Sequence, residues 1–250
     1  MKKPMAVFML VVSFSLVAQT LKAQYPSGEV VLERIDRNMS SRNRIFTSQM
    51  LIHGRRVSRT IESKTWAVGD EKAFTTYLAP AREKGVKMLK LGDKLWMYSP
   101  ATDRTIKISG HMLRQSMMGS DLSFEDMMED ARLQYRYNAV VTHTETIAER
   151  PCWVLKLSAK TENIAYYMRK LWVDQKRNIP LREELYARSG KLLKKLELNN
   201  VSRIQGRWFP RQLLFKDMLK KGQGTEFRIV TIQFDQDIPK RFFSKAVLRR

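Results

Sequence analysis

Apolar residues recur at every second position in several stretches of this chain, and this pattern limits the fold more than any other feature. In "RIFTSQMLIH" (44–53), Phe46, Met50 and Ile52 fall on one side. Successive side chains of a strand point to opposite faces of a sheet, so the alternation predicts half-buried strands. The same pattern places on one side Leu133, Tyr135, Tyr137, Ala139 and Val141 in one stretch, and Val230, Ile232 and Phe234 in another.

Turn signals separate these stretches, including "GD" at 69–70 and "KKGQG" at 220–224. About ten short strands in an antiparallel meander are expected. The runs "KLWMY" (94–98), "CWVLKL" (152–157) and "RKLWV" (169–173) carry apolar side chains on both faces. Strands of this kind need cover on both sides, which indicates a single large, curved sheet. The predicted fold class is therefore mainly β with short helices.

One helix is expected before the strands, at residues 27–39. Ser27 is the predicted N-cap, and Glu29 lies in the first turn, where the helix dipole favours an acid. The apolar face predicted for this helix consists of Val30, Val31, Ile35 and Met39.

The first residues have the pattern of a secretory signal peptide. Lys2 and Lys3 precede a run without charge from Pro4 to Leu21, and the small residue Ala23 follows. A retained membrane anchor is the alternative, but the apolar core is shorter than the roughly 20 residues that a spanning helix needs. We therefore expect a signal peptide at 1–23, a single domain at 24–250, and a periplasmic location for the mature protein.

The whole chain has a formal net charge of +21. Removal of Lys2, Lys3 and Lys22 with the signal peptide would leave a charge near +18. Such an excess suggests an anionic partner, although the basic residues are spread along the chain rather than gathered in one block. A nucleic acid is the first alternative, but export favours an anionic membrane surface or an acidic protein.

The sequence lacks the usual catalytic patterns. His53, His111 and His143 are isolated, Cys152 is the one cysteine and lies in an apolar run, and no HExxH, GxSxG or P-loop motif occurs. The neighbouring acids Glu125 and Asp126 fit the solvated first turn of a helix better than an acid–base pair. We expect no enzymatic activity, no cofactor and no metal site.

Residues 111–128, "HMLRQSMMGSDLSFEDMM", contain five of the chain's 14 methionines. We call this stretch the methionine segment. It is expected to form two short helical pieces separated by Gly119, Ser120 and Asp121, with Ser123 capping the second piece. In that piece Phe124, Met127, Met128 and Ala131 follow the spacing of one helix face. Methionine is common where a surface accepts varied apolar partners, but such a face equally suits a connector that seals a core.

Residues 80–128 resemble the outer-membrane lipoprotein-sorting proteins of the periplasm, which are related to the carrier LolA. The similar features are Pro80, Lys84-Gly85, "GDKLWMYSP" (92–100), "IKIS" (106–109) and "MGSDLSFEDM" (118–127). The resemblance implies a curved antiparallel sheet, an incomplete barrel, closed by short helical lid segments over an apolar cavity.

With this resemblance the methionine segment is expected to be the lid. Its predicted lipid-facing residues are Met112, Leu113, Met117, Met118, Leu122, Phe124, Met127 and Met128, and its predicted hinge is Gly119, Ser120 and Asp121. The candidates for the cavity wall are Phe46, Met50, Leu95, Trp96, Met97, Tyr98, Trp153 and Trp172.

The resemblance also implies a function. The expected protein is a monomeric periplasmic carrier that shields the acyl chains of lipids or lipoproteins between membranes and serves an inner-membrane exporter. The alternative is an envelope sensor or adaptor that binds a membrane partner through its basic surface.

The signal peptide gives the first testable prediction. Protein purified from the cell envelope should begin near Gln24, because the residues before it match a cleavable export signal. N-terminal sequencing measures this directly. Intact Met1 together with firm membrane attachment would contradict the prediction.

Overall fold

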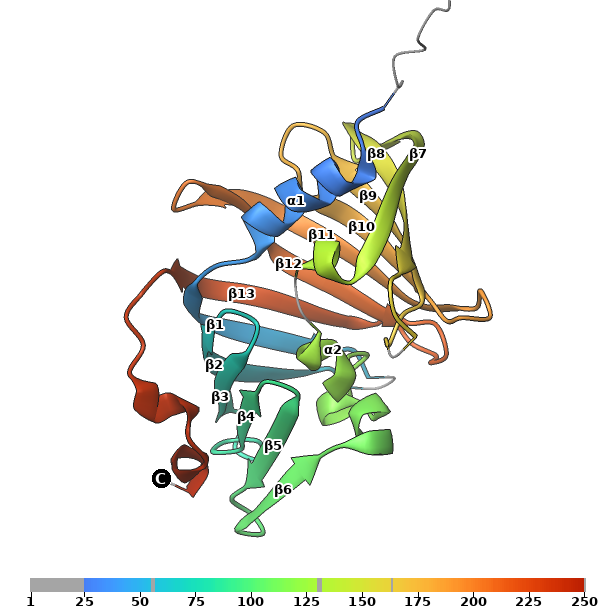
Figure 1. The fold of residues 1–250 in the computed structure, drawn as a ribbon. Coiled ribbons are helices and arrows are strands. Elements are labelled where there is room, and N and C mark those ends of the chain that lie inside the picture. Colours follow the sequence, from blue (N-terminus) through green and yellow to red (C-terminus); the bar gives the residue numbers. More distant parts are fainter. Residues whose placement is uncertain (1–24, 55–56, 130–131, 163, 250) are drawn as a thin grey trace, which may run out of the picture.

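The computed structural model describes residues 25–54, 57–129, 132–162 and 164–249, so the predicted signal peptide lies outside the described residues. One antiparallel sheet dominates the fold and curves around the helices on its inner face (Figure 1). Its strands are β1 (Asn43–Ile52), β2 (Arg59–Val68), β3 (Lys72–Ala79), β4 (Lys87–Leu91), β5 (Lys94–Ser99), β6 (Arg104–Ile108), β7 (Tyr137–Ile147), β8 (Arg150–Ala159), β9 (Met168–Asp174), β10 (Pro180–Tyr186), β11 (Leu192–Ile204), β12 (Arg207–Asp217) and β13 (Thr225–Phe234).

The predicted mainly-β fold is confirmed, but the described residues form 13 strands rather than about ten. Some of these strands lack a clean alternation, and β4 and β11 are two examples. Met88, Leu89 and Lys90 of β4 are all buried, and β11 carries long polar stretches. A search for period two alone passes over strands of this kind.

The order of strands across the sheet is β6-β5-β4-β3-β2-β1-β13-β12-β11-β10-β9-β8-β7. Strands β1 to β6 step outward to one edge, and β7 to β13 step back from the other edge until β13 pairs with β1. Strands β6 and β7 are consecutive in sequence yet lie at opposite edges. The connection between them, residues 109–136, must therefore cross a face of the sheet.

Short helices occupy this crossing and the two ends of the chain. They are α1 (Gly28–Met39), η1 (Gly110–Arg114), η2 (Met117–Gly119), α2 (Phe124–Met128), η3 (Leu133–Tyr135), η4 (Lys240–Phe243) and η5 (Lys245–Arg249), where η marks a 3-10 helix. Helices α1 and α2 lie on the inner, concave face, whereas η4 and η5 lie on the outer face (Figure 1).

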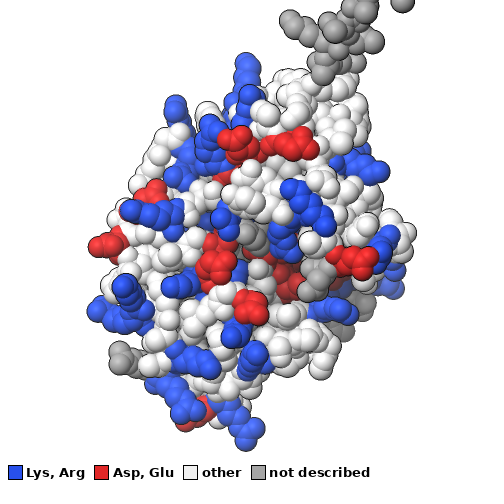
Figure 2. All heavy atoms as spheres, in the orientation of Figure 1, with Lys and Arg blue, Asp and Glu red and all other residues white. Residues whose placement is uncertain are grey.

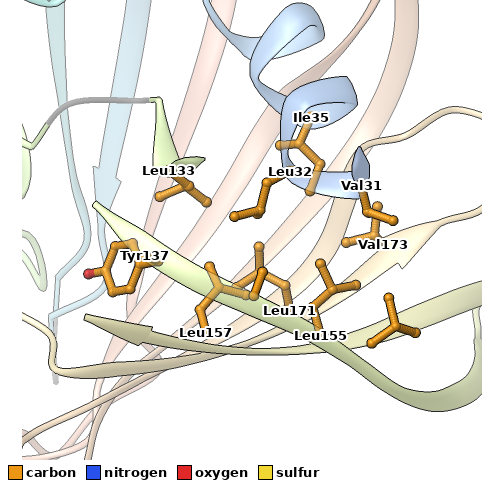
Figure 3. Packing of buried hydrophobic residues seen from close by; sticks show 11 residues of the cluster. Val31, Leu32, Ile35, Leu133, Tyr137, Leu155, Leu157, Leu171 and Val173 are labelled. Atoms are coloured by element: carbon orange, nitrogen blue, oxygen red, sulfur yellow. The ribbon is translucent and has the colours of Figure 1, made fainter. Parts of the chain in front are cut away.

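Helix α1 packs on β7, β8 and β9 with one narrow stripe. Ser27 caps it as predicted, because its hydroxyl accepts a hydrogen bond from the amide of Val30. The buried face is Val31, Leu32 and Ile35, which point toward Leu155, Leu157, Leu171 and Val173 of the sheet (Figure 3). Val30 was predicted on this face but is 40% exposed. The buried stripe runs through Val31, Leu32 and Ile35 and leaves Val30 at its border.

A buried carboxylate fixes α1 to the chain before β7. Asp36 is 2% exposed and accepts hydrogen bonds from the amides of Leu133, at 3.0 Å, and Gln134, at 3.2 Å. These bonds hold residues 133–135 in a 3-10 turn. The predicted strand therefore begins only at Tyr137, and Tyr135 does not share its buried side but is largely exposed.

Replacement of Asp36 by Ala should loosen this end of the core. The two amides lose their acceptor, and each buried donor left without a partner costs roughly 1–3 kcal/mol in the free energy of unfolding. Urea unfolding monitored by circular dichroism measures the loss. Glu33→Ala is the matched control, because this exposed carboxylate of the same helix pairs with exposed Arg37 and should contribute less than about 1 kcal/mol. Equal losses in the two variants would contradict the role given to Asp36.

Candidate functional site

The methionine segment covers the inner face of β1 to β6. All eight residues predicted to face a lipid belong to one apolar cluster with this part of the sheet, and Met117, Leu122 and Phe124 are the most buried of them. Their partners include residues that the sequence analysis did not propose for the cavity wall. These partners are Ile52, Ile61, Tyr77, Val86, Met88, Ile108, Phe215 and Phe227.

Local sequence explains the shape of the segment. The Ser123 hydroxyl accepts from the Asp126 amide while the Asp126 carboxylate accepts from the Ser123 amide, so α2 begins with a complete capping box. Before it the chain reverses with Met118 at φ 52° and Gly119 at φ 72°. The predicted cap at Ser123 is confirmed, but the first predicted helical piece is divided into η1 and η2 by the extended residues Gln115 and Ser116, and Gly119 is the last residue of η2. Ala131 of the predicted helix face lies outside the described residues.

Two of the three residues predicted as a hinge, Ser120 and Asp121, are firmly held. The Asp121 carboxylate accepts from the Asp217 amide and from the Thr225 hydroxyl, both at 2.9 Å, and the buried Ser120 hydroxyl donates to the Met117 carbonyl at 2.6 Å. The Lys220 ammonium donates to the Ser120 carbonyl at 2.7 Å. We call Ser120, Asp121, Asp217, Lys220 and Thr225 the clasp. Any movement of the methionine segment has to pivot about the clasp or break it.

A further contact fixes the reversed turn from the β2 side. The guanidinium of Arg59 donates to the carbonyl of Met118 and also forms an ion pair with Glu83 at 3.3 Å. The middle of the segment is thus held by polar contacts to β2, β12 and β13. Its two flanks, residues 112–117 and 122–128, face the sheet mainly with apolar side chains.

A buried ionic network involves Asp126 of α2 and Glu129, the residue that follows the helix. The Asp126 carboxylate accepts from the Lys194 ammonium and from the Tyr166 hydroxyl. Next to it, the guanidinium of Arg169 binds the carboxylate of Glu129 and lies 3.5 Å from that of Glu183. The network joins α2 and the chain after it to β9, β10 and β11.

Burial and neighbouring charges shift the acid–base equilibria of this network. Burial raises the pKa of the Glu183 carboxyl, and Arg169 beside it opposes the shift. Burial alone would lower the pKa of the Arg169 guanidinium, but Glu129, Tyr137 and Glu183 hold that pKa above its ordinary value. Burial and the Asp126 carboxylate raise the pKa of Tyr166, so the phenol stays neutral.

A cavity of about 720 Å³ opens beside the network, between the methionine segment and β11. Its lining mixes apolar residues such as Leu113 and Met128 with charged ones such as Arg114 and Glu129. Burial raises the pKa of the Glu125 carboxyl at this cavity. Within the described residues, no group of three His, Cys, Asp or Glu side chains is placed to hold a metal ion.

The predicted wall residues divide between the two faces of the sheet. Met50, Leu95 and Met97 contact the cluster under the methionine segment. Phe46 and Trp153 lie on the same inner face, in the clusters next to β13 and under α1.

The other three candidates do not belong to this wall. Trp96 and Tyr98 pack on the outer face against η4 and η5, and Trp172 lies in an outer cluster with Cys152. These strands are apolar on both faces, so the sequence pattern could not assign the concave side. The predicted burial of Cys152 is confirmed, since the residue is fully buried and its thiol is free.

Solved structures share this fold. An outer-membrane lipoprotein-sorting protein domain from Vibrio parahaemolyticus is 24% identical with a TM-score of 0.75, over 89% of this chain and 98% of that one. A LolA superfamily protein from Nitrosomonas europaea is 23% identical with a TM-score of 0.74, over 89% and 100%. A DUF1329 family protein from Desulfovibrio piger is 22% identical with a TM-score of 0.79, over 88% and 97%. The architecture is therefore the LolA-like open sheet.

At the level of sequence, the model of a family described as "Uncharacterized protein" matches residues 69–250, and the chain belongs to that family. No curated protein matches the chain in sequence. In the part of the chain that the structure describes, none of the helices has the length and hydropathy needed to cross a membrane.

Replacement of Asp121 by Ala should release the centre of the methionine segment. The variant loses two hydrogen bonds to a carboxylate, each worth about 1.5–3 kcal/mol and together about 3–6 kcal/mol, so amide exchange in residues 116–122 should accelerate by roughly 100-fold or more. Hydrogen–deuterium exchange with peptide mapping measures this, and β8 to β10 should keep their protection. Asp93→Ala removes an exposed carboxylate from the β4–β5 turn and serves as the control. Unchanged exchange in the Asp121 variant would show that the clasp does not hold the segment.

Proposed function

We propose that this protein is a periplasmic carrier that shields acyl chains of lipids or lipoproteins between the inner face of β1 to β6 and the methionine segment. The proposal depends on one observation, which is that the methionine segment covers the sheet mainly with apolar side chains. Outside its clasped centre and the ends of α2, the segment contacts the sheet through methionine, leucine and phenylalanine side chains. The LolA-like fold supports the same reading.

An acyl chain can replace the methionine segment on the sheet at little cost in free energy. Each methylene removed from water contributes about 0.8 kcal/mol. The methionine side chains on the sheet are flexible and polarizable, so an acyl chain can replace their contacts without leaving a polar group unpaired. Met112, Leu113, Met127 and Met128 are only partly buried, which marks the two flanks as the parts that yield first.

The expected partners follow from this role. The cargo enters from one membrane and leaves at another, so an inner-membrane exporter fits as a donor. The basic charge of the chain fits contact with anionic lipid surfaces. Both belong to the proposal.

Paired replacement of Met127 and Met128 tests the function. The double Ala variant should remain folded, with a loss of stability below the roughly 2–5 kcal/mol expected for each fully buried methionine, and its uptake of a fluorescent fatty-acyl probe should fall. The double Asp variant should take up no probe, because a carboxylate facing an acyl chain is left unpaired in apolar surroundings. Thermal melting and probe fluorescence are measured on the same samples.

Leu78→Asp provides the control, because this exposed residue of β3 lies next to buried Tyr77 and points to the opposite face. It should leave probe uptake unchanged. A wild-type protein that binds no acyl probe and carries no lipid when purified from the envelope would overturn the proposed function.

A further inference from the structure

Two hairpin tips beside the methionine segment expose large apolar side chains. Val57, between β1 and β2, is 78% exposed, and Leu219, between β12 and β13, is 61% exposed. Met218 next to it is 41% exposed. Val140, an equally exposed apolar residue, is on edge strand β7, far along the sheet from this pair of tips.

The register of the sheet brings the two tips together. Ile52, the last residue of β1, pairs with Arg59 of β2 on one side and with Thr225 of β13 on the other. Both turns therefore project from the same end of four neighbouring strands, β2, β1, β13 and β12. Figure 1 shows the β12–β13 tip at the end of the sheet where the methionine segment lies.

Basic groups surround the apolar tip of the β12–β13 hairpin. Lys220 and Lys221 are exposed and follow Leu219 directly. The acid in this turn, Asp217, is engaged within the protein, since its carboxylate accepts from the Leu219 amide at 2.9 Å and lies 3.7 Å from the Lys220 ammonium. Exposed apolar side chains next to lysines suit the boundary of a bilayer, where the former insert and the latter reach lipid phosphates.

The distribution of charge alone does not distinguish this surface from the rest of the molecule. Lys and Arg side chains are scattered over the visible face of the molecule in Figure 2, between acidic and uncharged residues, rather than gathered in one block. What distinguishes this end of the sheet is the combination of exposed apolar residues with lysines at the β12–β13 tip, together with the exposed Val57 at the adjacent tip.

We propose that Val57, Met218, Leu219, Lys220 and Lys221 form a docking surface for an anionic phospholipid bilayer. The inference rests on the proposed carrier function, because it gives the place where the carrier meets a membrane. Lys220 also belongs to the clasp, where its ammonium donates to the Ser120 carbonyl and to the Ser116 hydroxyl. Docking therefore brings lipid phosphates next to a lysine that holds the methionine segment, and the phosphates compete with those two oxygens for it.

Vesicle co-sedimentation of the full mature chain tests the docking surface. The probes are vesicles of equal parts phosphatidylcholine and phosphatidylglycerol, and vesicles of phosphatidylcholine alone. The double variant Met218→Asp/Leu219→Asp should bind the anionic vesicles at least roughly tenfold more weakly than the wild type. The double variant Lys220→Gln/Lys221→Gln should lose about fivefold for each lysine, and binding of the wild type should weaken as salt rises.

The controls carry the same changes elsewhere. Val140→Asp alters an equally exposed apolar residue on β7, and Lys72→Gln removes an exposed lysine at the start of β3, at the opposite end of the strands from the two tips. Both should bind vesicles as the wild type does. Equal losses in the controls, or wild-type binding that ignores phosphatidylglycerol, would overturn the proposal. Absence of vesicle binding would also overturn it and would point to a protein partner for this surface.

Uptake of the fatty-acyl probe in solution, without vesicles, separates the two proposals. Met218→Asp/Leu219→Asp should leave this uptake unchanged while vesicle binding falls. If the wild type docks on vesicles but takes up no probe, the carrier function fails and the docking surface stands. If it takes up the probe but does not dock, the docking surface alone fails.

Discussion

The strand order of the sheet is the constraint on which the rest of this molecule depends. Because β6 and β7 lie at opposite edges, the chain between them has to cross a face that would otherwise be open. A polar crossing would leave the apolar side chains of Ile61, Met88 and Leu95 against water, so the crossing has to be apolar on one side. The cluster of methionines in a strand-rich chain follows from that geometry.

Apolar packing holds the crossing segment on the sheet, but polar contacts fix the path that the segment follows across it. Apolar packing is non-directional, and methionine in particular adapts to many arrangements. Hydrogen bonds to Asp121 at the centre and to Asp126 after it fix where the chain lies. Unpaired buried charges are costly, so Arg169 and Glu183 keep their partners and the path after α2 is held in one place.

Local features of the fold could be predicted from sequence, and pairings between distant residues could not. Ser27 and Ser123 act within three residues of their own positions, so their caps were readable. The strand of Trp96 was readable as well, but a strand that is apolar on both faces does not reveal which side is concave. The partners of Asp121 lie about a hundred residues away in β12 and β13, and only the assembled sheet brings them to it. The candidate site was thus foreseen as a list of apolar residues and not as an anchored structure.

Anchoring the methionine segment at its middle has a mechanical consequence. The chain is tied at both ends to opposite edges of the sheet and is fixed again at Ser120 and Asp121. The parts before and after these two residues can therefore move separately, whereas the segment cannot move as one long lid. In the carrier proposed above, an acyl chain that displaces the half containing Leu113 leaves the half containing Met127 in place, so the chain can enter in steps and each step disturbs only half of the cover.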